Sequence, residues 1–134
     1  MDTKIFACLI VGSRSFTDYE KAKTSIDKML SKKREEGFSF IIVSGGAAGA
    51  DTLAKQYAEE YGYQYIEFPA DWNRYGRSAG AKRNEQMHQY ISQYEERGCI
   101  AFWDGISKGT QHSFTLAEKY NNPLRVIKTG EHNG

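Results

Sequence analysis

Residues 43–54 read V-S-G-G-A-A-G-A-D-T-L-A, and this stretch joins an apolar run to the start of a helical pattern. Mostly apolar residues fill 38–43, while Leu53, Ala54 and Tyr57 recur at the spacing of one helix face. A buried strand that passes through glycines directly into a helix is the unit from which parallel α/β sheets are built. The stretch therefore predicts one such unit, with a turn that carries almost no side chains.

The same alternation of strand and helix repeats along the chain. We expect strands at residues 5–11, 38–43, 63–68, 99–103 and 124–127. Four helical patterns lie between them. The first follows a capping-box sequence at 17–20 and stops at Gly37, and the second ends at Gly62. The third opens at 79–80 and ends before Gly98, and the fourth contains Phe114, Ala117 and Tyr120. The stretch 70–78 is expected to be irregular.

Strands that are apolar throughout and are joined by amphipathic helices predict a parallel sheet covered on both faces. With right-handed crossovers, the pattern predicts an α/β fold: a single Rossmann-like three-layer domain with a five-stranded parallel sheet in the order 3-2-1-4-5. We assign residues 1–128 to this domain and expect residues 129–134 to form a flexible tail.

The composition is that of a folded domain. Of 134 residues, 40% are hydrophobic and 26% are charged, which argues against a disordered chain. The net charge of +1 provides no overall field for a polyanion, so we do not expect nucleic acid as a partner. Cys8 and Cys99 lie in strand-like runs and are expected to be buried free thiols. No apolar stretch approaches about 18 residues, so we expect a cytoplasmic protein without membrane contact.

Small, polar and charged residues follow four of the predicted strands. Ligands of such sheets bind beyond the carboxyl ends of the strands, where these residues would form one rim. The residues are Gly12-Ser13-Arg14, Ser44-Gly45-Gly46, Pro69-Ala70-Asp71-Trp72 and Asp104-Gly105.

Two of these loops, at residues 45–51 and 105–110, lead into a helix through glycines spaced four apart. Glycine permits a close approach to the main chain, and the following helix directs free N–H groups and partial positive charge at the site. A phosphate is the predicted occupant. Asp51 either caps its own helix or contacts the ligand. Neither loop matches a P-loop, and a single Gly12 after the first strand does not match a dinucleotide fingerprint.

The segment 71–84 brings cations and aromatic rings to the same rim. Arginine can bind a phosphate through two parallel hydrogen bonds, and Trp72 or Tyr75 can stack on a base. Arg83 and Asn84 belong to the first turns of the third predicted helix, close to the rim, and are the ligand contacts we expect from this segment.

The motifs G-S-R, G-G-A-x-G-A-D, P-A-D-W, A-G-x-x-R-N and D-G-x-S-x-G-T occur in this order between residues 12 and 110. Together they resemble the SLOG superfamily, in its small single-domain branch related to YspA and YpsA. The resemblance implies a Rossmann-like pocket for a nucleotide or a nucleotide-derived ligand. By position it would be lined by Gly12, Ser13, Arg14, Gly45, Gly46, Gly49, Asp51, Arg83, Asn84, Gly109 and Thr110.

More distantly, the chain is similar to the Lonely-Guy phosphoribohydrolases, whose pattern is P-G-G-x-G-T-x-x-E. The catalytic glutamate of that pattern is replaced here by Ser113. Cleavage of an N-glycosidic bond requires a carboxylate that stabilises positive charge or positions water. Asp71, Asp104 and Glu85 are the candidate replacements, and Arg83 matches the catalytic arginine only loosely.

Three functions follow from this resemblance. The first is a sensor or ligand-binding domain for a nucleotide-like phosphate; the second is a nucleotide N-glycosidase or phosphoribohydrolase; the third, related to DprA, is binding of single-stranded DNA. His112 lies near the rim and either packs or acts as a neutral donor or base. No spacing matches a transition-metal site, and no cofactor is required, although Mg²⁺ could accompany a phosphate. Nine tyrosines, among them an aromatic face of Tyr57, Tyr61, Tyr90 and Tyr94, favour a homodimer.

Overall fold

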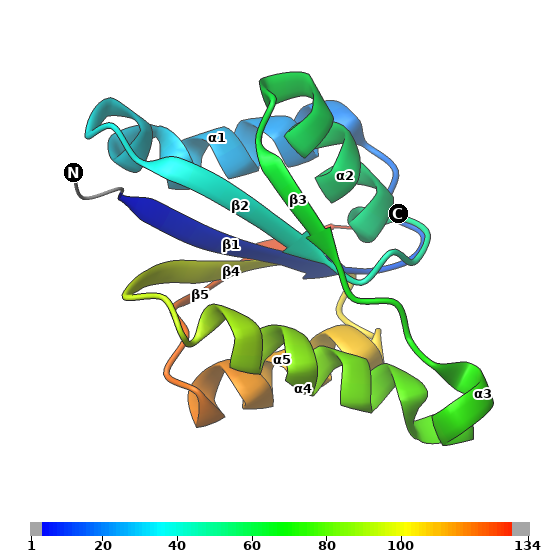
Figure 1. The fold of residues 1–134 in the computed structure, drawn as a ribbon. Helices are drawn as coiled ribbons and strands as arrows, with labels where there is room; N and C mark the ends of the chain where they lie inside the picture. Colours follow the sequence, from blue (N-terminus) through cyan, green and yellow to red (C-terminus); the bar gives the residue numbers. More distant parts are fainter. Residues whose placement is uncertain (1–3, 130–134) are drawn as a thin grey trace.

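The computed structural model describes residues 4–129 and contains a five-stranded sheet in the order β3-β2-β1-β4-β5 (Figure 1). The strands are β1 (Ile5–Gly12), β2 (Ser39–Ser44), β3 (Gln64–Glu67), β4 (Glu96–Trp103) and β5 (Leu124–Lys128). Each neighbouring pair is parallel. The predicted fold class and strand order are therefore confirmed.

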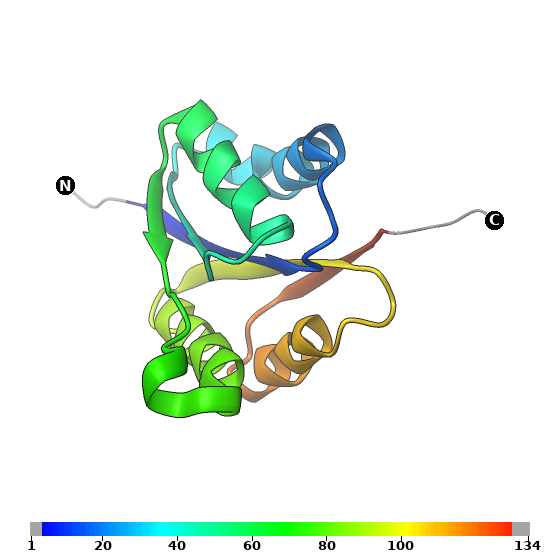
Figure 2. The same ribbon diagram turned by 90° about the vertical axis from the view of Figure 1, so that its right-hand side faces the viewer.

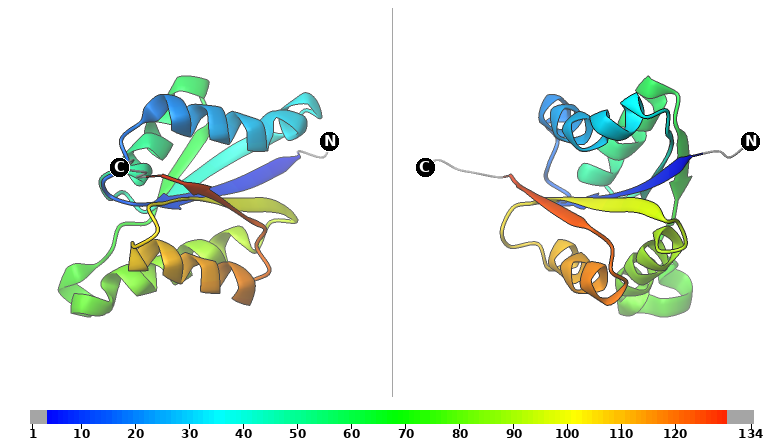
Figure 3. Two further views of the ribbon diagram at one scale, coloured as in Figure 1. Left: turned by 180° about the vertical axis from the view of Figure 1, so that it is seen from behind. Right: turned by 90° about the vertical axis from the view of Figure 1, so that its left-hand side faces the viewer.

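The helices form one layer on each face of the sheet (Figure 2). Helices α1 (Tyr19–Glu35) and α2 (Ala50–Tyr61) cover one face, and α4 (Ala79–Ile91) and α5 (Lys108–Lys119) cover the other. A short helix α3 (Trp72–Tyr75) and a 3-10 turn η1 (Gly76–Ser78) lead into α4. The two further views in Figure 3 show the same three layers.

Strand β1 lies at the centre of the sheet and contributes to the core on both faces. Its side chains alternate, as the two-residue period of a strand requires, between a cluster under α1 and α2 and a cluster against α4 and α5: Phe6, Cys8 and Ile10 belong to the first, and Ala7, Leu9 and Val11 to the second. Cys8 and Cys99 are buried free thiols, as predicted, and burial raises the pKa of both.

Two element ends differ from the prediction. The N-cap of α1 is Asp18, whose carboxylate accepts the Lys21 amide at 3.1 Å, and not the first residue of the 17–20 motif. Strand β4 begins at Glu96, which pairs with Phe6, so Gly98 lies inside a strand and does not end a helix. A side chain at Gly98 would collide with the Met29 side chain, and this close packing explains the glycine.

The stretch 70–78, predicted to be irregular, contains α3 and η1. Asp71 caps α3 by accepting the Arg74 amide at 3.1 Å. Four residues are too few to show a helical period in the sequence, and only the capping aspartate could have indicated this turn.

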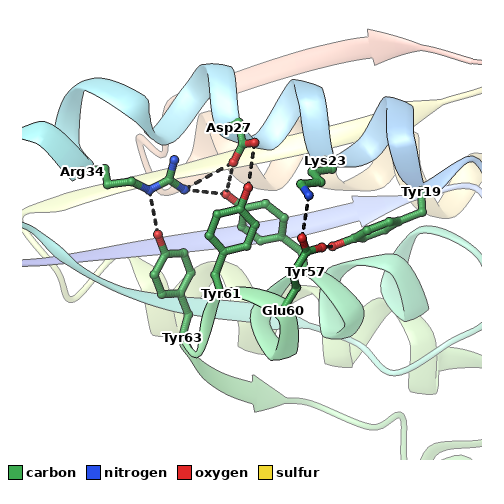
Figure 4. Close-up of polar contacts among 8 residues, drawn as sticks. All are labelled: Tyr19, Lys23, Asp27, Arg34, Tyr57, Glu60, Tyr61 and Tyr63. Atoms are coloured by element: carbon green, nitrogen blue, oxygen red, sulfur yellow. Dashed lines mark hydrogen bonds and ion pairs between the residues drawn. The ribbon is translucent and has the colours of Figure 1, made fainter.

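The predicted aromatic face is wrong, because α2 and α4 lie on opposite faces of the sheet. Tyr57 is buried, and its hydroxyl donates to Asp27 of α1 at 2.7 Å. Arg34 of α1 in turn donates to the hydroxyls of Tyr57 and Tyr63, so these rings hold α1 to α2 and to the residue before β3 (Figure 4). A homodimer stays a prediction, without this face to support it.

The predicted tail, 129–134, lies outside the described residues except for Thr129. Thr129 is buried, and its amide donates to the Trp103 carbonyl at 2.8 Å, so this residue continues the pairing of β5 with β4. Within residues 4–129, no helix combines the length and the apolar character needed to cross a membrane.

Candidate functional site

A hollow of about 730 Å³, here called the main pocket, opens at the carboxyl edge of the sheet. It lies where the loops after β1 and β4 meet the first turns of α2, α4 and α5. This volume is within the range of about 300–1,000 Å³ that is typical of small-molecule sites. Nine of the predicted site residues line it: Gly12, Ser13, Arg14, Asp51, Arg83, Asn84, Asp104, Gly109 and Thr110.

Other predicted residues lie in neighbouring hollows. Gly45, Gly46 and Trp72 line a second hollow of about 340 Å³, the side pocket. Asp71 and Tyr75 line a third, of about 120 Å³. The main pocket and the side pocket have three lining residues in common: Arg14, Ala47 and Arg83.

Three predicted residues lie beneath or beside these hollows. Ser44 is buried, and its hydroxyl is 2.6 Å from the Tyr65 hydroxyl. Gly49 has φ +76°, and any side chain there would meet the Ser13 and Arg14 carbonyls, so only glycine fits this turn. Gly105, with φ +90°, forms an exposed turn outside the main pocket.

The loop that leads into α5 presents open amides to the main pocket. The Asp104 carboxylate accepts the amides of Ile106 at 2.9 Å and Ser107 at 2.8 Å. The Ser107 hydroxyl caps the Thr110 amide at 3.4 Å. The two amides between these, those of Lys108 and Gly109, have no acceptor among the described residues. They are the free N–H groups of the helix start.

In the loop that leads into α2, groups of the protein itself accept hydrogen bonds from backbone amides. The Asp51 carboxylate accepts the Ala47 amide at 3.1 Å, and the Ser13 carbonyl accepts the Ala50 amide at 3.2 Å. Only Ala47 and Asp51 of this loop and helix start reach the main pocket. The prediction that both glycine loops bind one anion side by side is therefore too simple, since this loop already holds an internal carboxylate.

Arg83 separates the main pocket from the side pocket. Its Nη1 donates to the Gly45 carbonyl at 2.8 Å, and its Nε donates to Asn84 Oδ1 at 3.0 Å. A side chain at Gly45 would overlap the guanidinium group, so this glycine makes room for the arginine. Burial lowers the pKa of Arg83 and the nearby Asp51 carboxylate raises it; arginine stays protonated at any physiological pH.

The floor of the main pocket lies between α4 and α5. Met87 and Ser113 are fully or almost fully buried there, and the Asn84 side chain donates to the Gly109 carbonyl at 3.4 Å. The Ser113 hydroxyl has no hydrogen-bond partner among the described residues. A buried hydroxyl without a partner is unusual.

Two carboxylates of the main pocket have pKa shifts of opposite sign. Burial raises the pKa of Asp51 to about 6, although the Ala47 amide and Arg83 act in the other direction. The amides of Ile106 and Ser107 hold the pKa of Asp104 below its ordinary value. The other charged groups that line this pocket are Arg14, Arg83 and Lys108, so cations predominate around the open amides.

Comparisons with known proteins show the family of the chain. Residues 7–75 match the model of the YspA, cpYpsA-related SLOG family. The chain belongs to this family. It is also 32% identical over 129 residues to the Gene 61 protein of Mycobacterium phage D29, with 92% of this chain and 95% of the phage protein covered.

Two solved structures are similar at low sequence identity. The Moco carrier protein of Chlamydomonas reinhardtii is 15% identical, with a TM-score of 0.49, 98% of this chain and 78% of that chain covered. The C-terminal domain of a Pyrococcus furiosus hydrogenase is 14% identical, with a TM-score of 0.49, 93% of this chain and 90% of that chain covered.

Sequence reasoning did not select the main-chain donors of Lys108 or the apolar contacts of Ile106 and Met87. A signal for the first was present, because Ser107 is a typical N-cap residue that would have placed the helix start at Lys108. Nothing in the spacing of Met87 distinguishes a core position from a residue at the floor of a pocket. No cluster of metal-ligating side chains occurs among residues 4–129.

Proposed function

We propose that this protein binds a nucleotide or a nucleotide-derived phosphate in the main pocket and serves as a ligand-binding or sensing domain. The observation that carries the proposal is the open amides of Lys108 and Gly109 in the same hollow as the Arg14 and Arg83 side chains. Backbone donors at a helix start combined with arginines are a typical phosphate environment. Membership of the SLOG family supports the same ligand class.

The rest of the pocket suits a nucleoside. Part of its wall consists of apolar and small residues such as Val11, Met87 and Ile106. A base or sugar could pack on this wall while the phosphate contacts the start of α5. The side chain of Asn84 is a polar group at the floor.

The carboxylates that were candidates for catalysis already form hydrogen bonds or an ion pair within the protein, which favours binding over hydrolysis. Asp104 accepts two backbone amides, and Asp71 caps α3. Glu85 pairs with Lys119 and accepts a hydrogen bond from the Tyr120 hydroxyl at 2.7 Å. The position of the glutamate in the hydrolase pattern is occupied by Ser113, which can act neither as a general base nor as a charged group.

The test is calorimetric titration with nucleoside 5′-monophosphates and the matching nucleosides. Arg14 is exposed and has no hydrogen-bond partner among the described residues, so Arg14→Ala removes a pocket cation without disturbing the fold. We expect the nucleotide affinity of this variant to be about 10- to 150-fold weaker, because a charge-assisted hydrogen bond contributes about 1.5–3 kcal/mol.

Arg77→Ala is the matched control, since Arg77 is an exposed arginine of η1 that lines none of the three hollows. Its nucleotide affinity should equal that of the wild type. Equal binding of nucleosides and nucleotides would refute the phosphate site. Release of free base during the incubation would instead support phosphoribohydrolase activity.

A further inference from the structure

The side pocket adjoins the main pocket at Arg14 and Arg83. The two hollows share these arginines and Ala47, so a ligand in the main pocket that extends past the arginines enters the side pocket. The side pocket adds about 340 Å³ to the main pocket, which alone is large enough for a nucleoside monophosphate. A monophosphate would leave this second space unused.

The charges around the two hollows differ. Arg14 and Arg83 lie between them and can neutralise a phosphate group on either side. The other residues that line the side pocket carry no charge: Gly45, Gly46, Ala47, Ala48, Pro69, Ala70 and Trp72. No charged side chain beyond these arginines lines the side pocket within residues 4–129, so this space fits an uncharged group.

The surface of the side pocket fits a ring. It is lined by the main chain and small residues of 45–48 and by Pro69, Ala70 and Trp72. Trp72 is 52% exposed, which leaves a large part of its ring free for stacking. The amides of Gly46 and Ala48 have no acceptor within residues 4–129 and can bind oxygen or nitrogen atoms at the edge of a ring.

From this arrangement we infer that the ligand is a nucleoside diphosphate esterified to a second, uncharged ring, with the diphosphate at Arg14 and Arg83 and the second ring against Trp72. This inference rests on the proposed function and narrows its ligand class. Base–aromatic stacking of the kind expected at Trp72 changes affinity by roughly 5- to 150-fold.

Three ligands that share one base separate the contribution of the second ring from that of the phosphate charge. A nucleoside monophosphate fills the main pocket, the diphosphate adds a charge, and the symmetric dinucleoside diphosphate adds the second ring. The series is measured calorimetrically for each of the four common bases. We expect the dinucleoside diphosphate to bind at least about tenfold more tightly than the diphosphate.

Trp72→Ala should abolish this advantage and leave the affinities for the monophosphate and the diphosphate unchanged. Trp72→Phe should restore most of it, because a phenyl ring also stacks. Tyr75→Ala is the control, since Tyr75 belongs to the same short helix but lines the third hollow. Trp72 is half exposed and outside both core clusters, so these variants should fold normally.

The inference is overturned if the dinucleoside diphosphate binds no more tightly than the diphosphate, or if Trp72→Ala weakens all three ligands equally. In either case binding of the monophosphate would leave the proposed function intact. Failure of all three ligands to bind for every base would refute the proposed function as well.

Discussion

The glycine loops before α2 and α5 have similar sequences and different chemistry. Each contains an aspartate that accepts backbone amides, Asp51 in one case and Asp104 in the other. Asp104 precedes its helix and takes amides of the loop, so the amides of Lys108 and Gly109 remain open. Asp51 lies within the first turn of its helix and reaches back to Ala47, which places a carboxylate inside the loop itself.

Burial accounts for the opposite pKa shifts of Asp51 and Asp104. Asp51 is only 8% exposed, and the loss of hydration outweighs its hydrogen bonds, so its pKa is raised. Asp104 remains partly hydrated, and its hydrogen bonds prevail, so its pKa is lowered. The position of one carboxylate relative to a helix start thus decides whether a glycine loop can receive an external anion.

The largest expected effect on the free energy of unfolding is the difference between alanine substitutions at Gly49 and at Gly109. Gly49→Ala forces a side chain into a backbone with φ +76° and against the Ser13 and Arg14 carbonyls. We expect a loss of about 3 kcal/mol in the free energy of unfolding, measured by urea denaturation. Gly109→Ala is the matched substitution in the other loop, where nothing lies within 4 Å of the added methyl group.

Because alanine has fewer unfolded conformations and favours helices, Gly109→Ala should leave stability unchanged or raise it by about 0.4–1 kcal/mol. Comparable losses for both variants would show that the loops are equally constrained, contrary to the structure.

The next effect is a pH dependence caused by Asp51. Its pKa rises from 3.8 in the unfolded chain to about 6 in the folded protein, so the folded state binds more protons between these values. Stability conferred by the neutral form is therefore lost as the pH increases from 4 to 7. Relative to Asp51→Asn, whose side chain stays neutral, the wild type should lose about 2–3 kcal/mol over this range.

Urea denaturation of both proteins at several pH values measures this difference. A constant difference from pH 4 to pH 7 would mean that Asp51 has an ordinary pKa and that its burial is not costly.

The smallest effect is expected at Asp104, because water screens its interactions. Asp104→Ala should reduce the free energy of unfolding by about 1 kcal/mol at pH 7, since it removes the acceptor of two amides. The lowered pKa has the opposite consequence to that of Asp51: the stabilisation is complete above the ordinary value of 3.8 and is lost as the pH falls through the folded pKa. Equal stability of wild type and variant at pH 7 would argue that these hydrogen bonds contribute nothing.

The sequence was sufficient to predict the sheet and its strand order. Apolar runs such as 5–11 have to be buried on both faces, and this requirement specifies a parallel sheet between two helix layers. It was not sufficient to place the tyrosines, because the face on which Tyr57 and Tyr90 lie depends on the crossovers of α2 and α4.

Most residues of the main pocket were also predictable, because the carboxyl ends of parallel strands converge on one edge. The division into the main pocket and the side pocket could not be predicted from the sequence. It depends on the Arg83 guanidinium lying over Gly45 and on Asp51 reaching back to Ala47, and both are tertiary contacts between segments that no spacing connects.

The most direct test of the central claim is a titration of ¹⁵N-labelled protein with a nucleoside monophosphate, followed through the backbone amide resonances. The claim is that the anion binds at the start of α5 and not in the loop before α2. We expect the largest shifts at the amides of Lys108 and Gly109, with little change at Ala47. The largest shifts at Ala47 and Gly46, with Lys108 and Gly109 unaffected, would contradict it.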